Sequence, residues 1–133
     1  MYFNRRFKMR GNGESIRDYI YINDIVDIYK ILAKNLYSKP KKYSGEIFNA
    51  GTNTPYKTKT ILKNIFTYKK RIKELSKVNK IIKKNKTSGE LQVQYMNYIK
   101  LNKNFGWKPK YEFGKVLPEV FKWYEDYFKN TSP

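Results

Sequence analysis

Residues 17–29 read RDYIYINDIVDIY, and the spacing of their apolar side chains changes midway. Up to Ile22, alternate residues are apolar, which is the two-residue period of a β-strand. From Ile25 the apolar positions lie three and four residues apart, as on an amphipathic helix. Asn23 and Asp24 stand at the change, where a side-chain oxygen can accept a hydrogen bond from the first free N–H groups of a helix. The stretch therefore predicts a strand that runs directly into a capped helix.

Working outward from this stretch, apolar period and turn residues predict the other elements. The expected elements are, in order, a strand over 16–22, a helix over 24–36, a basic loop over 39–44, a short buried strand over 45–51, a helix over 58–68, an extended segment over 91–95, a helix over 98–105 and a final helix over 114–128. Asn97 is expected to cap the third helix and Gly106 to end it. Pro118 fits a helix only in its first turn, so the last helix is allowed to begin as late as Leu117.

The charged block 69–86 is read as a helical extension followed by a short strand. Four aromatic residues outside it are spaced like packing residues and are predicted to lie in the core: Trp107, Trp123, Tyr124 and Phe128. Such residues could instead stack on bases in a nucleic-acid binder. That class of protein would carry exposed aromatics within its basic block, and residues 69–86 contain none. We therefore favour packing.

The composition limits the kind of protein this can be. At 133 residues the chain is expected to form one small domain. Its 29 Lys and Arg against 11 Asp and Glu give a net charge of +18, which suits an anionic partner. The competing reading is a coding bias that leaves solvated lysines on the surface. Only five of the 29 basic residues are arginine, which favours that reading, because phosphate contacts prefer the guanidinium fork.

Missing residue types exclude several classes of site. Without cysteine the chain has no disulfides or thiolate metal sites, and without histidine it lacks the commonest general base and zinc ligand. We expect no metal site. The basic start MYFNRRFKMR is not followed by an apolar run, so no signal peptide is expected. No window approaches the roughly 18 apolar residues of a membrane span. The expectation is a cytoplasmic protein without a membrane segment.

Four stretches are similar, in order, to motifs of one enzyme family. Residues 11–29, GNGESIRDYIYINDIVDIY, resemble G-x-G-x-x-x-R-D-[YFW]-[IVL]-Y-V-x-D, and residues 45–55, GEIFNAGTNTP, resemble G-E-x-[FY]-N-x-G. Residues 94–111, QYMNYIKLNKNFGWKPKY, resemble x-Y-x-D-x-x-K-x-x-x-x-L-G-W-x-P, and residues 120–128, VFKWYEDYF, resemble a closing helix with Trp-Tyr. Over residues 11–128 the chain thus resembles the NAD-dependent nucleotide-sugar epimerases and dehydratases, the extended short-chain dehydrogenase/reductase family.

This resemblance implies a fold and a domain organisation. The matched motifs belong to the carboxyl-terminal, substrate-binding portion of the family. The expected fold class is therefore α/β, an α+β-like small portion with short strands, three to four helices and no complete Rossmann fold. Residues 11–130 would form this substrate-binding domain fragment, and residues 1–10 a residual basic connection. In the complete family this portion binds a nucleotide sugar, and the enzyme is a homodimer.

Four residues are candidates for substrate binding. In the family, the arginine before Asp-aromatic contacts the diphosphate of the sugar nucleotide, and Arg17 holds that position. A guanidinium fixed on a strand could bind phosphate through two parallel hydrogen bonds; the alternative is an ion pair with Asp18. Gln94 matches the place of a second diphosphate arginine, where an amide can hydrogen-bond without neutralising charge. Lys8 and Arg10 match, by position only, a stretch that lies beside the nucleotide base.

NAD is the cofactor of the complete family enzyme, but this chain is not expected to bind NAD alone. The dinucleotide fingerprint needs a glycine-rich turn between a strand and a helix. Gly11-Asn12-Gly13 lacks the third glycine and precedes a predicted strand. The spacing Tyr-x-x-x-Lys occurs at Tyr37…Lys41 and Tyr111…Lys115, at about the frequency that chance gives. No catalytic residue is therefore assigned.

The leading hypothesis is the sugar-nucleotide-binding carboxyl-terminal part of an NAD-dependent 4,6-dehydratase or epimerase. Alone it would not be catalytic, and its NAD-binding half would be a separately encoded partner or missing. The alternative is a small basic nucleic-acid-binding module, which rests on the net charge of +18 and the block 69–86. The ordered motif matches favour the first hypothesis, so a nucleic-acid partner is not expected.

Overall fold

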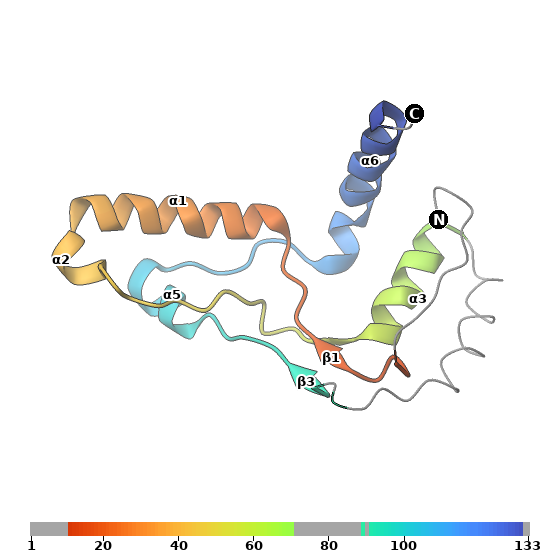
Figure 1. Ribbon diagram of the computed structural model, residues 1–133, viewed down its shortest axis with the longest axis horizontal. Helices are drawn as coiled ribbons and strands as arrows, with labels where there is room; N and C mark the ends of the chain where they lie inside the picture. Colours follow the sequence, from red (N-terminus) through yellow and green to blue (C-terminus); the bar gives the residue numbers. More distant parts are fainter. Residues whose placement is uncertain (1–10, 71–88, 90, 132–133) are drawn as a thin grey trace.

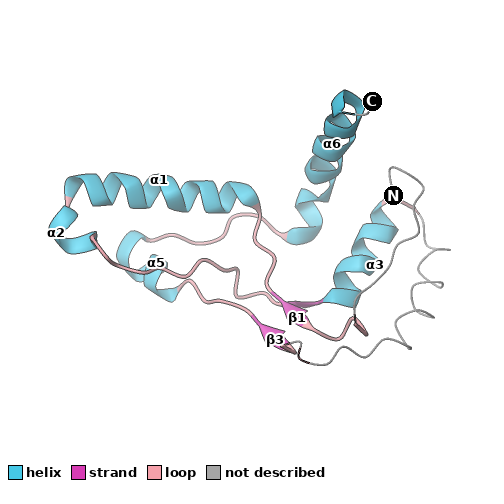
Figure 2. Cartoon of the chain, viewed as in Figure 1, coloured by secondary structure: helices cyan, strands magenta, loops and turns pink. Residues whose placement is uncertain are grey.

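The computed structural model describes residues 11–70, 89 and 91–131, and within them the chain is a small α/β structure (Figures 1 and 2). The elements are β1 (Ile16–Arg17), α1 (Ile22–Ser38), α2 (Pro40–Tyr43), β2 (Tyr56–Lys57), α3 (Thr58–Tyr68), β3 (Val93–Gln94), α5 (Ile99–Phe105) and α6 (Phe113–Thr131). The expected fold class is confirmed, with α2 as one helix that was not expected. The structure predicted for most of the block 69–86 lies outside the described residues.

Three very short strands form one sheet in the order β2-β1-β3. The central strand β1 pairs antiparallel with β2 and parallel with β3. Its two residues, Ile16 and Arg17, face Val93 and Gln94 on one side. The strand expected over 16–22 is therefore correct only at its start, because both neighbouring strands pair with just these two residues.

Two connections differ from the expectation. The basic loop expected over 39–44 contains α2, which begins at Pro40, because proline has a fixed φ and lacks only an N–H that is unpaired in the first turn anyway. The strand expected over 45–51 is wrong, because no strand pairs with this segment. Side-chain contacts hold it instead: Lys100 Nζ donates to Glu46 Oε2 at 2.6 Å and to the Ile47 carbonyl at 2.8 Å.

One hydrophobic cluster joins α1 to α5 and the turn that follows. Ile28, Leu101 and Trp107 are buried at its centre, and Phe48 and Phe105 pack against them. The burial of Trp107 confirms that prediction. Gly106 ends α5 with φ of 68°, the left-handed conformation that glycine adopts without strain. The predicted cap is present in altered form, since Asn97 Oδ1 accepts the Ile99 N–H at 3.2 Å although Tyr98 occupies the cap position.

At the other end of the molecule, α3 packs against α6 (Figure 1). The buried apolar side chains here are Ile61, Phe66, Val116 and Leu117. Trp123 and Tyr124 were predicted to be core, but they are 58% and 49% exposed. They lie beyond the α6 stripe that meets α3, so that prediction is wrong for both residues, whereas Phe128 is partly buried.

Helix α6 also begins earlier than expected. It starts at Phe113, so Pro118 lies inside the helix and not in its first turn. Because proline has no N–H, the Gly114 carbonyl loses its intrahelical partner at this point. The first-turn placement of Pro118 was therefore wrong.

Candidate functional site

Two of the predicted substrate-binding residues meet in the sheet. Arg17 on β1 and Gln94 on β3 are register partners on adjacent parallel strands, although 77 positions separate them in the sequence. The pairing is held by the Ile16 N–H, which donates to the Gln92 carbonyl at 2.8 Å. Arg17 is partly buried and its Nη1 donates to the Ile16 carbonyl at 2.8 Å, whereas Gln94 is exposed. A cation and an amide thus lie side by side at one point of the sheet.

Asp18, the residue after Arg17, holds the loop that follows the second family motif. Its Oδ2 accepts the Thr52 N–H at 2.7 Å, and its Oδ1 accepts a hydrogen bond from the Thr52 hydroxyl. The carboxylate therefore makes its ordered contacts with Thr52, which weighs against the ion pair with Arg17 considered above. Sequence reasoning missed this contact; the signal was the family order of Arg-Asp followed by Asn-Ala-Gly.

Gly51 is buried in the same junction because there is no space for a side chain. A Cβ at this position would lie 2.1 Å from the Met96 carbonyl oxygen and 2.6 Å from Asp18 Oδ2. Met96 follows Gln94 by two residues, so the close approach of Gly51 positions the end of β3. The junction therefore links the strand that carries Arg17 to the strand that carries Gln94.

Asp24 does not cap α1, and this expectation is wrong. Tyr21 is the cap residue, and Asp24 lies within the first turn of the helix. Its side chain is fully buried, and its two carboxylate oxygens accept the N–H groups of Lys110 at 3.0 Å and Tyr111 at 3.3 Å. The carboxylate therefore ties α1 to the segment that leads into α6, and its role is structural.

The Gly11–Gly13 turn does not fit a dinucleotide. It precedes β1 and no helix, and its carbonyl groups face the start of α3: the Gly13 carbonyl accepts the Lys59 N–H, and the Ser15 carbonyl accepts the Thr58 N–H, each at 3.0 Å. These donors at the helix N-terminus are thus already used and are not available to a phosphate. Glu14 forms ion pairs with Lys57 and Lys59, which lower its pKa, Lys59 more strongly. The residues present do not build a site for NAD.

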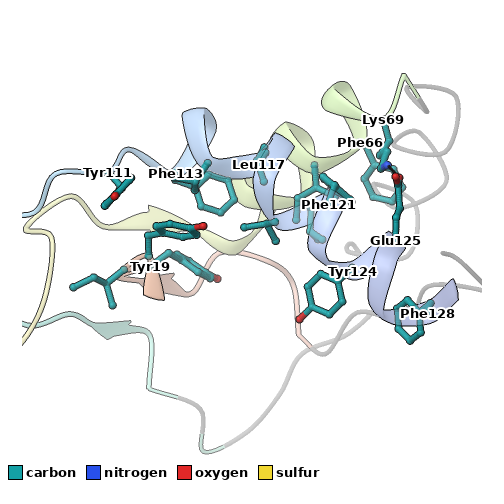
Figure 3. A pocket seen from close by; sticks show the side chains of 16 residues that line it. Tyr19, Phe66, Lys69, Tyr111, Phe113, Leu117, Phe121, Tyr124, Glu125 and Phe128 are labelled. Carbon is teal, nitrogen blue, oxygen red and sulfur yellow. Dashed lines mark hydrogen bonds and ion pairs between the residues drawn. The ribbon is translucent and has the colours of Figure 1, made fainter. Parts of the chain in front are cut away.

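An apolar cavity of about 620 Å³ lies between α3, α6 and the segment that follows Arg17 (Figure 3). Its lining residues are Tyr19, Ile20, Tyr21, Leu62, Ile65, Phe66, Lys69, Tyr111, Phe113, Val116, Leu117, Val120, Phe121, Tyr124, Glu125 and Phe128. Lys69 Nζ and Glu125 Oε1 pair at 2.5 Å, and this contact lowers the pKa of Glu125. Figure 3 shows the pair at one end of the hollow and Tyr19 at the other.

Tyr19 also lines a second, more polar cavity of about 210 Å³ next to Thr52 and Tyr56. Among the described residues, neither Arg17 nor Gln94 lines either cavity. Tyr21 has its pKa raised to about 12, chiefly because its hydroxyl hydrogen-bonds to the Glu119 carboxylate. The Arg17–Gln94 pair is thus an open site on a sheet, with its nearest hollow apolar.

The remaining predicted site residues, Lys8 and Arg10, lie outside the described part of the chain. In the part that the structure covers, no group of three or more acidic residues is arranged to hold a metal ion. Likewise, no helix within the described ranges is long and apolar enough to cross a membrane.

The fold, a small sheet with Arg17 on its central strand, is that of nucleotide-sugar dehydratases and epimerases of the extended short-chain dehydrogenase/reductase class. The structure superimposes on dTDP-glucose 4,6-dehydratase from Bacillus anthracis, solved in complex with NAD, with a TM-score of 0.68 at 21% identity. The UDP-glucose 4-epimerase from Thermotoga maritima, solved with UDP-glucose, gives a TM-score of 0.60 at 22% identity. The family model of GDP-mannose 4,6 dehydratase matches residues 4–120, and the chain belongs to this family.

The match covers most of this chain but a minor part of its relatives. Human dTDP-D-glucose 4,6-dehydratase is 24% identical over 127 residues, which are 96% of this chain and 35% of the human protein. The Bacillus and Thermotoga structures are covered to 37% and 36% of their chains, with 96% and 92% of this chain aligned. The chain therefore spans about a third of the length of these relatives.

Proposed function

We propose that this chain is the sugar-nucleotide-binding carboxyl-terminal part of an NAD-dependent nucleotide-sugar 4,6-dehydratase or 4-epimerase, acting in the cytoplasm. The observation that carries the proposal is the pairing of Arg17 with Gln94 in register on adjacent strands. Family membership supports it, because residues 4–120 match the dehydratase model. The role of the chain is to bind and orient the substrate.

The chemistry of the pair suits a diphosphate. A guanidinium presents parallel donors to phosphate oxygens and stays charged at any physiological pH. The neighbouring amide of Gln94 can donate a further hydrogen bond but adds no charge. We therefore assign the stronger phosphate contact to Arg17 and a weaker, orienting contact to Gln94. Lys8 and Arg10 remain candidates for contacts beside the nucleotide base.

The proposed activity needs a second part that holds NAD. In the complete family NAD takes the hydride from the sugar, and the described residues of this chain build no site for that cofactor. Orientation of a sugar accelerates a reaction only when the reacting partner is held beside it. We therefore propose that this chain has no turnover alone and works with an NAD-binding half, supplied as a separate polypeptide, in an enzyme that is a homodimer.

Calorimetry with dTDP-glucose and UDP-glucose tests the binding role of Arg17. The full chain is titrated alone and together with the part of the Bacillus anthracis enzyme that it does not match. Replacing Arg17→Ala should weaken binding by about 1.5–3 kcal/mol, the scale of a hydrogen bond to a charged group. Arg17→Lys should fall between the two, because it keeps the charge and loses the fork. Lys63→Ala, which removes an exposed cation from α3, is the control and should change little.

Equal affinities for wild type and Arg17→Ala would refute the assignment. A different outcome would favour the nucleic-acid alternative: binding to RNA or DNA that falls steeply with salt, with no preference for sugar nucleotides.

A further inference from the structure

The apolar cavity between α3 and α6 is more open than a folded chain of this size would leave without a partner. Tyr124 on its wall is 49% exposed, and Tyr111 at its edge is 38% exposed. Exposed apolar hollows of this kind mark surfaces where another molecule packs. The question is which occupant the residues favour.

A small molecule is a poor match to this cavity. Ligand pockets combine apolar walls with a few polar groups that are free to fix the ligand's orientation. Here both charged lining residues, Lys69 and Glu125, are paired with each other at 2.5 Å. The Tyr21 hydroxyl is engaged by Glu119. Lys69 also lies over the Phe121 ring at 4.3 Å, which occupies the cation further. The cavity thus offers apolar area and few directed polar contacts.

A second copy of the chain is also disfavoured. Two chains of net charge +18 repel one another, and an apolar patch of this size would have to overcome that repulsion. A partner with fewer positive charges would meet no such penalty.

The location and the length of the relatives indicate a particular partner. The cavity wall begins at Tyr19, two residues after Arg17, so a molecule seated there lies beside the proposed phosphate site. The relatives continue for about two thirds of their length beyond the matched part. A family fold of that size must pack its remaining part against this one.

We propose that the α3–α6 cavity is the docking surface for the NAD-binding part of the family fold, which inserts an apolar segment between Tyr19, Phe66, Phe121 and Tyr124. The inference rests on the proposed function. It adds the surface through which the two parts assemble, and it holds whether that part is joined to this chain or is a separate polypeptide. Docking there places the second part next to Arg17 and closes the open side of the site.

The test uses a matched pair of variants on one helix. Tyr124 lines the cavity and is 49% exposed; Tyr127 is 47% exposed and does not line it. Tyr124→Glu and Tyr127→Glu therefore place the same carboxylate at equally exposed positions of α6. The probes are the unmatched parts of the Bacillus anthracis dehydratase and the Thermotoga maritima epimerase, each mixed with the full chain. Association is measured by sedimentation velocity and by calorimetry.

Wild type and Tyr127→Glu should associate with at least one probe, and Tyr124→Glu should bind about tenfold more weakly or worse, because the carboxylate would be buried in an apolar interface. Equal binding by the two variants, or no association of wild type with either probe, would overturn the proposal. So would a wild-type homodimer that Tyr124→Glu dissociates, since the occupant would then be a second copy. A lower melting temperature for isolated Tyr124→Glu alone would overturn it in favour of cover by this chain itself.

The same samples separate this proposal from the proposed function. Arg17→Ala should associate like wild type and lose affinity only for the sugar nucleotide. If the parts assemble but no sugar nucleotide binds, the docking surface stands and the substrate assignment fails. If the sugar nucleotide binds and the two tyrosine variants behave alike, the reverse holds.

Discussion

Replacing Gly51→Ala tests whether the Arg17 and Gln94 strands are positioned by close backbone packing. The added methyl carbon would lie 2.1 Å from the Met96 carbonyl oxygen and 2.6 Å from Asp18 Oδ2. Ordinary carbon–oxygen contacts are about 3.3–3.6 Å. One side of the junction must therefore move by about 1.2 Å. The Met96 oxygen belongs to the backbone and cannot rotate away, so the strain falls on the end of β3.

The expected cost is about 2–3 kcal/mol of unfolding free energy, the upper part of the range for added volume in a packed site. Urea denaturation followed by circular dichroism measures it. Gly114→Ala is the matched control, because a Cβ there has no atom within 4 Å. That variant should be neutral or more stable by up to about 1 kcal/mol, since alanine favours a helix over glycine.

Sugar-nucleotide affinity gives a second measure of the same change. Because Met96 lies two residues after Gln94, a shift of β3 should also weaken binding in Gly51→Ala and leave it unchanged in Gly114→Ala. If Gly51→Ala unfolds at the same urea concentration as wild type, the packing argument for the junction is refuted.

Two further perturbations concern buried and paired carboxylates. Asp24→Ala should cost about 3 kcal/mol, because two backbone N–H groups lose a charged acceptor, whereas Asp27→Ala on the same helix removes only the surface pair with Lys110 and should cost less than about 1 kcal/mol; equal losses in urea denaturation would contradict the tether. The pKa of Glu125 is lowered from the ordinary value of 4.5 by the hydrogen bond from Lys69, so its contribution to stability is present above 4.5 and lost as the pH falls through the lowered value. Glu125→Gln should therefore show a smaller loss of unfolding free energy on acidification than wild type, and identical pH profiles would count against the pair.

The sequence predicts best where a local signal decides the structure. The helical period from Ile25 onward locates α1, and Gly106 marks the end of α5 because only a left-handed residue closes that turn without strain. Arg17 was identified through its motif position, and its strand placement followed from the alternating period around it. These features depend on residues close together in the chain.

The errors come from contacts between distant residues. Asp24 looked like a helix cap because its partners, the N–H groups of Lys110 and Tyr111, are 86 and 87 positions away. Residues 45–51 have a strand-like composition, but a strand also needs a neighbour, and none pairs there. Trp123 and Tyr124 have the spacing of core residues, yet the surface that would cover them does not come from the described part of this chain. The pairing of Arg17 with Gln94 likewise depends on β1–β3 register, which no local pattern encodes.

The buried side chains fall into two separate centres, one around Leu101 and Trp107 and one between α3 and α6. The Asp24 carboxylate fastens the connecting segment at Lys110 and Tyr111, so α6 can separate from α3 without disturbing the first centre. Amide protons of α3 and α6 should therefore exchange with solvent through a smaller opening than those of α1 and α5. The molecule has a durable end and a yielding end, and the yielding end is the one that holds the apolar hollow.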